Sequence, residues 1–148
     1  RQEEFLMKIS TRGRYALRVM IDLARQTPDT YTPLKEIAAR QNISEKYLEN
    51  IIKTLVKQQF LTGLRGKKGG YRLTKQPDEY TVGSILRLTE GTLAPVSCVE
   101  ECTPECPRQS VCPTHPLWKK LNSMITHYLD SVTLFDLMTA DIDKGKDF

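Results

Sequence analysis

Residues 32–56 combine helical periodicity with one sharp break, which leaves few folds open to them. Thr32-Pro33 supplies a cap and a first-turn proline for a short helix, and the pattern then breaks at residues 41–42. Ser44 caps a longer helix after the break. Apolar residues recur at helical spacing in both stretches: Leu34, Ile37, Ala38, Tyr47, Leu48, Ile51, Ile52, Leu55 and Val56. A short helix, a tight turn and a longer helix predict a helix-turn-helix.

A glycine-rich hairpin is predicted directly after this unit. Two strand-like runs, Leu61–Arg65 and Tyr71–Thr74, flank a cationic turn at residues 66–70. A further helix is expected after a cap at Ser10 or Thr11, with helical spacing up to Ala24 and a break at Pro28-Asp29, and another is expected at 81–90, ended by Gly91. The predicted fold class is mainly α with a small β-hairpin wing, that is, a winged helix-turn-helix followed by a long C-terminal dimerisation helix.

Charge divides this chain of 148 residues into two unlike parts. Residues 1–75 hold 16 Lys and Arg against 7 Asp and Glu, a net charge of +9, whereas residues 76–148 hold 6 against 11, a net charge of −5. A basic part joined to an acidic one is typical of a polyanion-binding module, although ordinary surface charge is the alternative. No apolar run long enough for a membrane span or an export signal occurs, so a cytoplasmic, reducing location is expected.

All four cysteines lie in a proline-rich segment, residues 92–113, that lacks helical periodicity. Their spacing is Cys98-x3-Cys102-x3-Cys106-x5-Cys112, and His115 follows after two more residues. Thiolates are soft ligands that suit iron–sulfur clusters, zinc or copper(I), and cysteines in a reducing compartment are more often ligands or redox thiols than disulfides. The spacing therefore favours a metal site, and unliganded thiols in an irregular loop are the alternative.

Helical periodicity returns at Thr114 or Pro116 and continues for about four turns. Its apolar residues are Leu117, Leu121, Met124, Ile125, Tyr128 and Val132. A long amphipathic helix needs a partner surface, which is either a second copy of itself or its own domain. One or two last helical turns are expected at 133–138, and residues 140–148 are expected to form a flexible tail.

Candidate DNA contacts lie on three predicted elements. A recognition helix reads base edges with polar residues near its N-terminus. Here Lys46 can donate to guanine, Glu49 can accept from cytosine, and Asn50 can pair with adenine. Phosphate contacts are expected before and within the first helix, and a wing arginine can enter a narrow minor groove. The full predicted set is Lys8, Arg12, Arg14, Ser44, Lys46, Tyr47, Glu49, Asn50, Arg65, Lys67 and Lys68.

Three separated motifs resemble the Rrf-type bacterial transcription regulators, a family that includes IscR, NsrR, RirA and CymR. They are MKISTRGRY at 7–15, ISEKYLENI at 43–51 and RGKKGGYRL at 65–73, and the resemblance runs from Met7 to about Leu137. The likeness is greatest to the IscR-like iron–sulfur regulators. It implies a homodimeric repressor on a palindromic operator, with bases read by Ser44, Lys46, Glu49 and Asn50 and with Arg65 aimed at the minor groove. Lys46 stands where IscR has serine, so the preferred operator sequence is expected to differ.

The segment from Cys106 to Trp118 also resembles the IscR cluster loop, in which three cysteines and a histidine hold a 2Fe–2S cluster. The third cysteine departs from that pattern, because IscR-like spacing would place it at Glu100. The spacing from Cys98 to Cys106 instead resembles RirA, whose relatives carry a 4Fe–4S cluster. The ligands implied are Cys98, Cys106, Cys112 and His115, with Cys102 as a substitute, and 2Fe–2S is the preferred cluster. CymR relatives lack these cysteines and bind a partner protein.

The predicted organisation has four parts. Residues 1–6 are a leader, 7–80 the winged helix-turn-helix, 81–139 the cluster-binding loop (92–115) with the dimerisation helix, and 140–148 the tail. An enzyme is not expected, since paired carboxylates, a nucleophile elbow and a nucleotide-binding loop are missing from the sequence. The rival hypotheses are a regulator with a structural zinc or redox-thiol loop, a partner-binding regulator of CymR type, and a protein-interaction module whose basic half is incidental.

Overall fold

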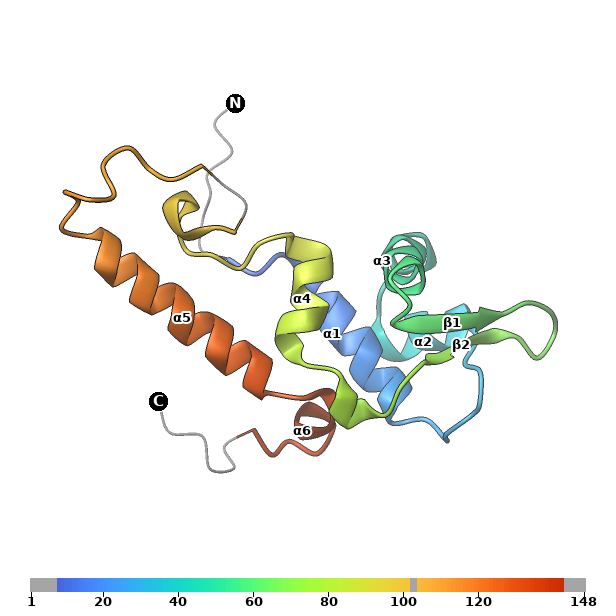
Figure 1. Ribbon diagram of the computed structural model, residues 1–148. Coiled ribbons are helices and arrows are strands. Elements are labelled where there is room, and N and C mark those ends of the chain that lie inside the picture. The colour runs from blue at the N-terminus through green and yellow to red at the C-terminus, as the bar shows by residue number, and fades with distance from the viewer. Residues whose placement is uncertain (1–7, 102–103, 143–148) are drawn as a thin grey trace.

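The computed structural model describes residues 8–101 and 104–142. Figure 1 shows α4 between the central helix α1 and the long helix α5, with the β-hairpin projecting on the opposite side. In chain order the elements are α1 (Thr11–Ala24), α2 (Leu34–Gln41), α3 (Glu45–Lys57), β1 (Leu61–Leu64), β2 (Gly70–Leu73), the 3-10 turn η1 (Pro77–Glu79), α4 (Val82–Glu90), the 3-10 turn η2 (Ser97–Val99), α5 (His115–Ser131) and α6 (Leu134–Met138). The predicted fold class is confirmed. The predicted leader, Cys102 and the end of the predicted tail lie outside the described residues.

Side-chain caps fix the starts of three helices, and the sequence predicts two of them, at Ser10 and Ser44. Ser10 accepts a hydrogen bond from the backbone N–H of Gly13, Ser44 accepts from Tyr47, and Thr81 accepts from Ser84. Gly91, with φ of 76°, ends α4. Each cap satisfies a backbone donor that a helix start would otherwise leave without a partner.

The tight turn of the helix-turn-helix is made by Asn42, which adopts left-handed backbone angles (φ 52°, ψ 50°). Asparagine tolerates this conformation better than most residues with a side chain. The next residue, Ile43, donates its N–H to the carbonyl of Ala38 at 3.1 Å and buries its side chain in the core. The turn therefore sets the angle at which α3 leaves α2.

The prediction that Thr32 caps the second helix is wrong. α2 begins at Leu34, Pro33 occupies the cap position, and no side chain caps the helix. Thr32 instead pairs with Tyr71 of β2 through two backbone hydrogen bonds of 2.9 and 2.8 Å. The backbone pairing holds Thr32 extended beside the wing, and its side chain does not cap α2.

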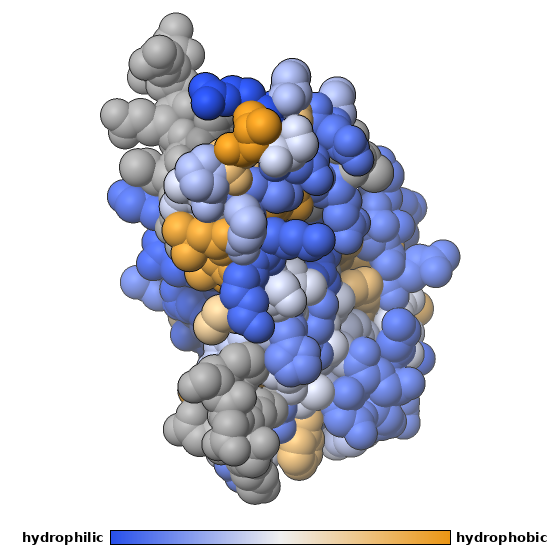
Figure 2. Space-filling model, turned by 60° about the vertical axis from the view of Figure 1, so that its left-hand side comes forward, coloured by the Kyte–Doolittle hydropathy of each residue, from blue (hydrophilic) through white to orange (hydrophobic). Residues whose placement is uncertain are grey.

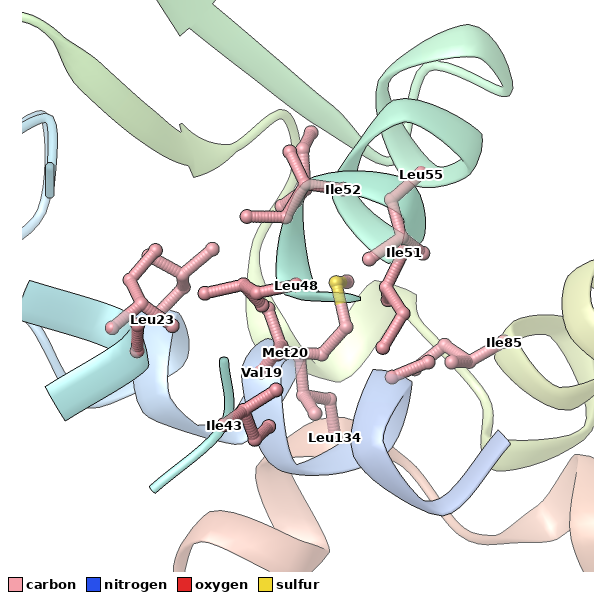
Figure 3. Packing of buried hydrophobic residues seen from close by; sticks show 14 of the residues in the cluster. Val19, Met20, Leu23, Ile43, Leu48, Ile51, Ile52, Leu55, Ile85 and Leu134 are labelled. Atoms are coloured by element: carbon pink, nitrogen blue, oxygen red, sulfur yellow. The ribbon is translucent and has the colours of Figure 1, made fainter. Parts of the chain in front are cut away.

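One hydrophobic core joins the parts of the chain before and after residue 80 (Figure 3). Met20 of α1 and Ile51 of α3 pack with Ile85 of α4 and Leu134 of α6, all of them fully buried. Tyr80 is also buried, and its hydroxyl donates to the carbonyl of Phe60 at 2.8 Å. The wing strands, the helix-turn-helix and the C-terminal helices are thus fixed to one another by packing.

Candidate DNA interface and sensor loop

Helix α3 divides cleanly into a buried face and an exposed polar face. Leu48, Ile51, Ile52 and Leu55 are buried. Lys46, Glu49 and Asn50 are exposed, so all three predicted base-reading side chains are accessible to a major groove. Ser44 is exposed as well, but its hydroxyl accepts from the N–H of Tyr47 at 3.2 Å and so also serves as the helix cap.

Tyr47 is held by an aromatic contact with α1. Its ring packs edge-on against Tyr15 with centroids 5.7 Å apart, and the guanidinium of Arg18 lies 5.0 Å from the centroid of the Tyr15 ring. Arg18 also donates to the carbonyl of Gln41. The sequence did not single out Arg18, which here links α1, α2 and the exposed face of α3.

The predicted phosphate contacts at the start of α1 differ in exposure. Lys8 and Arg14 are exposed, whereas Arg12 is half-buried. The Nη2 atom of Arg12 donates to the hydroxyl of Thr54 in α3 at 2.5 Å. Arg12 therefore ties α1 to the recognition helix, a role that its position in the sequence did not reveal.

An ion pair with a buried carboxylate fixes α2 against α1. The carboxylate of Asp22 is only 3% exposed and accepts from Arg40 at 2.7 and 3.0 Å and from Gln41 at 2.8 Å. The pKa of Arg40 is raised, because Asp22 accepts its hydrogen bonds and attracts its charge. Sequence reasoning missed this pair, although Asp22 is the only acidic residue between Thr11 and Ala24.

The wing is a two-stranded antiparallel hairpin in which Leu61 pairs with Leu73 and Leu64 with Gly70. Gly66 has φ of 112°, a conformation that glycine adopts without strain, and its carbonyl accepts from Gly69 at 3.0 Å. Arg65, Lys67 and Lys68 are all exposed around this turn. The predicted wing cations therefore surround the turn of the hairpin, and Figure 1 shows this hairpin projecting from the helices.

Two of the predicted metal ligands line one pocket. Cys98 of η2 and His115, the first residue of α5, border a cavity of about 320 Å³ that Lys119 and Asn122 also line. Cys106 and Cys112 are half-exposed and lie in the irregular segment before α5. Within residues 8–101 and 104–142, no three Cys, His, Asp or Glu side chains are arranged to hold a metal ion.

The donor set nevertheless has the right chemistry for a soft metal centre, since it consists of three thiols and an imidazole. The Sγ of Cys112 lies 3.2 Å from the hydroxyl of Thr114. That hydrogen bond, together with the Thr114 and His115 backbone, lowers the pKa of the Cys112 thiol. A lowered pKa favours the thiolate, which is the form that binds metals.

Helix α5 buries none of its residues in the protomer. Leu117 and Met124 are 57% and 44% exposed. The predicted interface residues Leu121, Ile125 and Tyr128 are half-buried, whereas Val132 is 3% exposed and packs with Val82 and Leu86. Figure 2 shows the side of the molecule that lies to the left in Figure 1, where apolar side chains appear among hydrophilic ones.

Helix α5 is attached to the rest of the protomer at its C-terminal end and near its middle. Near its C-terminal end, Asp130 forms a two-bonded ion pair with Arg87 of α4 at 2.8 and 2.9 Å, and the N–H of Val82 donates to the carbonyl of Val132. Near the middle of the helix, the side-chain amide of Asn122 donates to the carbonyl of Val99 in η2 at 3.4 Å. The helix therefore connects the cysteine segment to α4.

Comparison with known proteins gives the chain its family. Residues 9–140 match the family model Rrf2, described as an iron-dependent transcriptional regulator. The chain belongs to the Rrf2 family. Protein rrf2 of Nitratidesulfovibrio vulgaris is 39% identical over 132 residues, which cover 89% of this chain and 87% of that protein.

Solved structures of Rrf2 family members share the fold. The structure of CymR, the global cysteine regulator of B. subtilis, superposes with a TM-score of 0.74 at 38% identity, covering 91% of this chain and 98% of that one. IscR of T. potens has a TM-score of 0.70 at 32% identity, covering 95% and 93%. The chain is therefore a DNA-binding transcriptional regulator and not an enzyme. Among the described residues, no helix is long and apolar enough to cross a membrane.

Proposed function

We propose that this regulator acts in the bacterial cytoplasm as a homodimeric repressor of palindromic operators. Two copies of α3 would enter successive major grooves about one helical turn apart, with the wings over the flanking minor grooves. The exposed row of Lys46, Glu49 and Asn50 supports base reading, and the exposed wing cations support contacts to phosphates. Residues 7–80 would form the DNA-reading unit and residues 81–139 the sensing and dimerising unit.

The dimer would form through α5. Leu117 and Met124 offer exposed apolar surface on a helix that has no fully buried residue in its own protomer, and Leu121, Ile125 and Tyr128, which are half-buried, border them. Val132 is left out of this interface because its side chain is already taken up by the protomer. Full burial of a large apolar side chain contributes about 1.5–3 kcal/mol, so covering these residues in a dimer would favour association.

The dimer is tested by charging its surface. Met124→Glu should give a monomer in analytical ultracentrifugation and lose operator affinity, because a carboxylate cannot be buried cheaply between two helices. Ser123→Glu is the matched control, since this exposed residue lies about 100° around the helix from Met124. If Met124→Glu remains a dimer with full affinity, the copies associate through another surface.

We further propose that Cys98, Cys106, Cys112 and His115 hold an iron–sulfur cluster, of the 2Fe–2S type, with Cys102 able to replace Cys98. The observation that supports this proposal is that Cys98, early in the segment, and His115, at its end, line the same pocket. A bound cluster supplies sensitivity to iron supply and oxidants. A four-iron cluster with the same thiols is the alternative.

The chain's own residues would turn occupancy of this site into a change in DNA binding. Binding to one centre would draw Cys98, Cys106 and Cys112 together just before α5, and Val99, next to Cys98, accepts a hydrogen bond from Asn122 of that helix. A shift of α5 would alter how two protomers pair, and hence the spacing of their α3 helices. A coupling of about 1–3 kcal/mol would change operator affinity about 5–150-fold.

The decisive experiment is anaerobic purification with iron and sulfide analysis, a visible spectrum and operator titration. Cys106→Ala and Cys112→Ala should lose the colour and change operator affinity, whereas Ser110→Ala in the same segment should do neither. Colourless protein with bound zinc would instead support a structural zinc loop. Metal-free protein whose affinity follows thiol oxidation would support a redox-thiol loop, and both results would overturn the cluster.

A further inference from the structure

Glu90, the last residue of α4, reaches across the fold to the cap of α1. Its Oε1 accepts a hydrogen bond from the backbone N–H of Ser10 at 2.9 Å and another from the Ser10 hydroxyl at 2.6 Å. The same hydroxyl accepts from the N–H of Gly13 at 3.0 Å and so caps α1. One carboxylate thus fixes the residue on which the start of α1 depends, although the two residues are 80 positions apart.

Glu90 also supplies charge that α1 lacks. The N-terminus of a helix carries partial positive charge, and an acidic residue in the first turn usually complements it. α1 has no acidic residue there, and Arg12 and Arg14 add positive charge to the same turn. A carboxylate brought from α4 therefore offsets this charge, and charge-assisted hydrogen bonds are stronger than neutral ones.

Gly13 makes room for this contact. A Cβ atom at Gly13 would lie 2.3 Å from Oε1 of Glu90 and 3.1 Å from the hydroxyl of Thr89. Glycine is disfavoured within helices, so its presence in α1 needs a local cause. The close approach of the Glu90 carboxylate supplies that cause.

The contact lies next to the cysteine segment. Gly91 follows Glu90 with φ of 76°, and residues 92–101 lead from there through Cys98. Glu90 lines a cavity of about 860 Å³ together with Lys8, Ile9, residues 92–97 and the α5 residues Ile125, Tyr128 and Leu129. Movement of the segment can therefore reach the Glu90 carboxylate through a single intervening residue.

We propose that the Ser10–Glu90 contact, named here the α1 clamp, transmits the state of the cysteine segment to the DNA-binding surface. With the cysteines of the segment bound to their ligand, the clamp is closed and holds the exposed Arg14 where it would contact a phosphate. With the segment rearranged about Gly91, the carboxylate leaves Ser10 and the start of α1 loosens. This inference rests on the proposed cluster control and names the residue pair through which it acts.

The test compares Glu90→Ala and Gly13→Ala with Asp78→Ala, an exposed acidic control in η1. Operator affinity is titrated for anaerobically purified iron-containing protein and for the same protein after iron removal. For the unsubstituted chain and for Asp78→Ala, we expect the operator affinities of the iron-containing and iron-free forms to differ by about 5–150-fold. In Glu90→Ala and Gly13→Ala this ratio should fall below about twofold.

Hydrogen exchange gives a second measurement that does not depend on DNA. The amides of Gly13 and Arg14 donate to the side chain and backbone of Ser10, so they should exchange more slowly in the iron-containing protein. Both variants should remove that difference. Gly13→Ala is interpreted alone if Glu90→Ala does not fold, because it deletes no hydrogen-bonding group and adds a better helix former.

The outcomes separate two failures. If the cysteine variants change operator affinity while Glu90→Ala and Gly13→Ala keep the full ratio between the two forms, the α1 clamp is overturned and cluster control stands. If iron removal leaves the affinity of the unsubstituted chain unchanged, cluster control fails and the clamp fails with it.

Discussion

Asp22 and Arg40 form a forked ion pair in which one partner is buried and the other reaches solvent. The side chain of Asp22 is 3% exposed and that of Arg40 is 38% exposed, with contacts of 2.7 and 3.0 Å between them. The pair joins α1 to α2, and through the Asn42 turn it sets the position of α3. Loss of the Asp22 side chain and loss of the Arg40 side chain should therefore reduce the stability of the protein by different amounts.

Removing the arginine should destabilise the protein more than removing the carboxylate. Arg40→Ala leaves a buried charge with Gln41 as its remaining partner, which should cost about 3–5 kcal/mol. Asp22→Asn leaves an arginine that water can solvate, so a loss of about 1–3 kcal/mol is expected. Urea unfolding of both variants measures the difference, and equal losses would contradict the unequal burial. Lys35→Ala, an exposed residue of the same helix α2, is the control.

A methyl group at Gly70 should disrupt the wing. A Cβ there would lie 2.2 Å from the backbone carbonyl of Thr32, so the pairing between Thr32 and Tyr71 would have to open. Gly70→Ala should cost more than about 1 kcal/mol of stability and weaken operator binding. Gly66→Ala is the control, because its φ is also positive but nothing lies within 4 Å of the added atom. Equal thermal unfolding temperatures for the two variants would argue against this cause.

The wing lysines should contribute electrostatically and without sequence preference. Removing one cation that pairs with a phosphate lowers the slope of log affinity against log salt concentration by about 0.9. Lys67→Ala and Lys68→Ala should each reduce the slope by up to that amount and weaken binding to all duplexes alike. Lys120→Ala, on the exposed part of α5, should leave the slope unchanged. The check is a salt titration by fluorescence anisotropy, and an unchanged slope in both wing variants would remove the wing from the interface.

Asn50 should act on specificity. A good two-bonded contact between a side chain and a base discriminates against the wrong base by about 1–3 kcal/mol. Asn50→Ala should therefore lose about 5–150-fold of the preference for the best operator over operators with another base at the one position that Asn50 contacts. Its binding to unrelated DNA should change little. Competition binding with a set of single-base operator variants measures this. Lys53→Ala, further along the exposed face of α3, serves as the comparison.

Local signals made most of the fold predictable. Ser10, Ser44 and Thr81 cap their helices through bonds to residues three positions on, so the sequence alone carries the information. Thr32 fails the same reasoning because its partner, Tyr71, is a distant residue whose backbone competes for it. Whether a residue caps a helix depends on both local and remote hydrogen bonds, and sequence patterns reveal only the local ones.

The exposed residues of the candidate site were predictable from the sequence, but the contacts between the helices that hold those residues were not. Charge and spacing indicate Lys46, Asn50 and the wing cations, because an exposed side chain needs no partner to be recognised. The contacts from Arg12 to Thr54 and from Ser10 to Glu90 depend on how α1 packs against α3 and α4. No periodicity in the sequence encodes those packing angles, so the network behind the DNA-facing surface emerges only in three dimensions.

The place of Leu134 in the main core has a consequence for how such a protein can be divided. A fragment ending at residue 80 would lack both Ile85 and Leu134 and would expose the apolar side chains that they cover. The DNA-reading unit could not be transferred to another sensor as an independent module. Inherited changes at either end of the gene must remain compatible with one shared hydrophobic core.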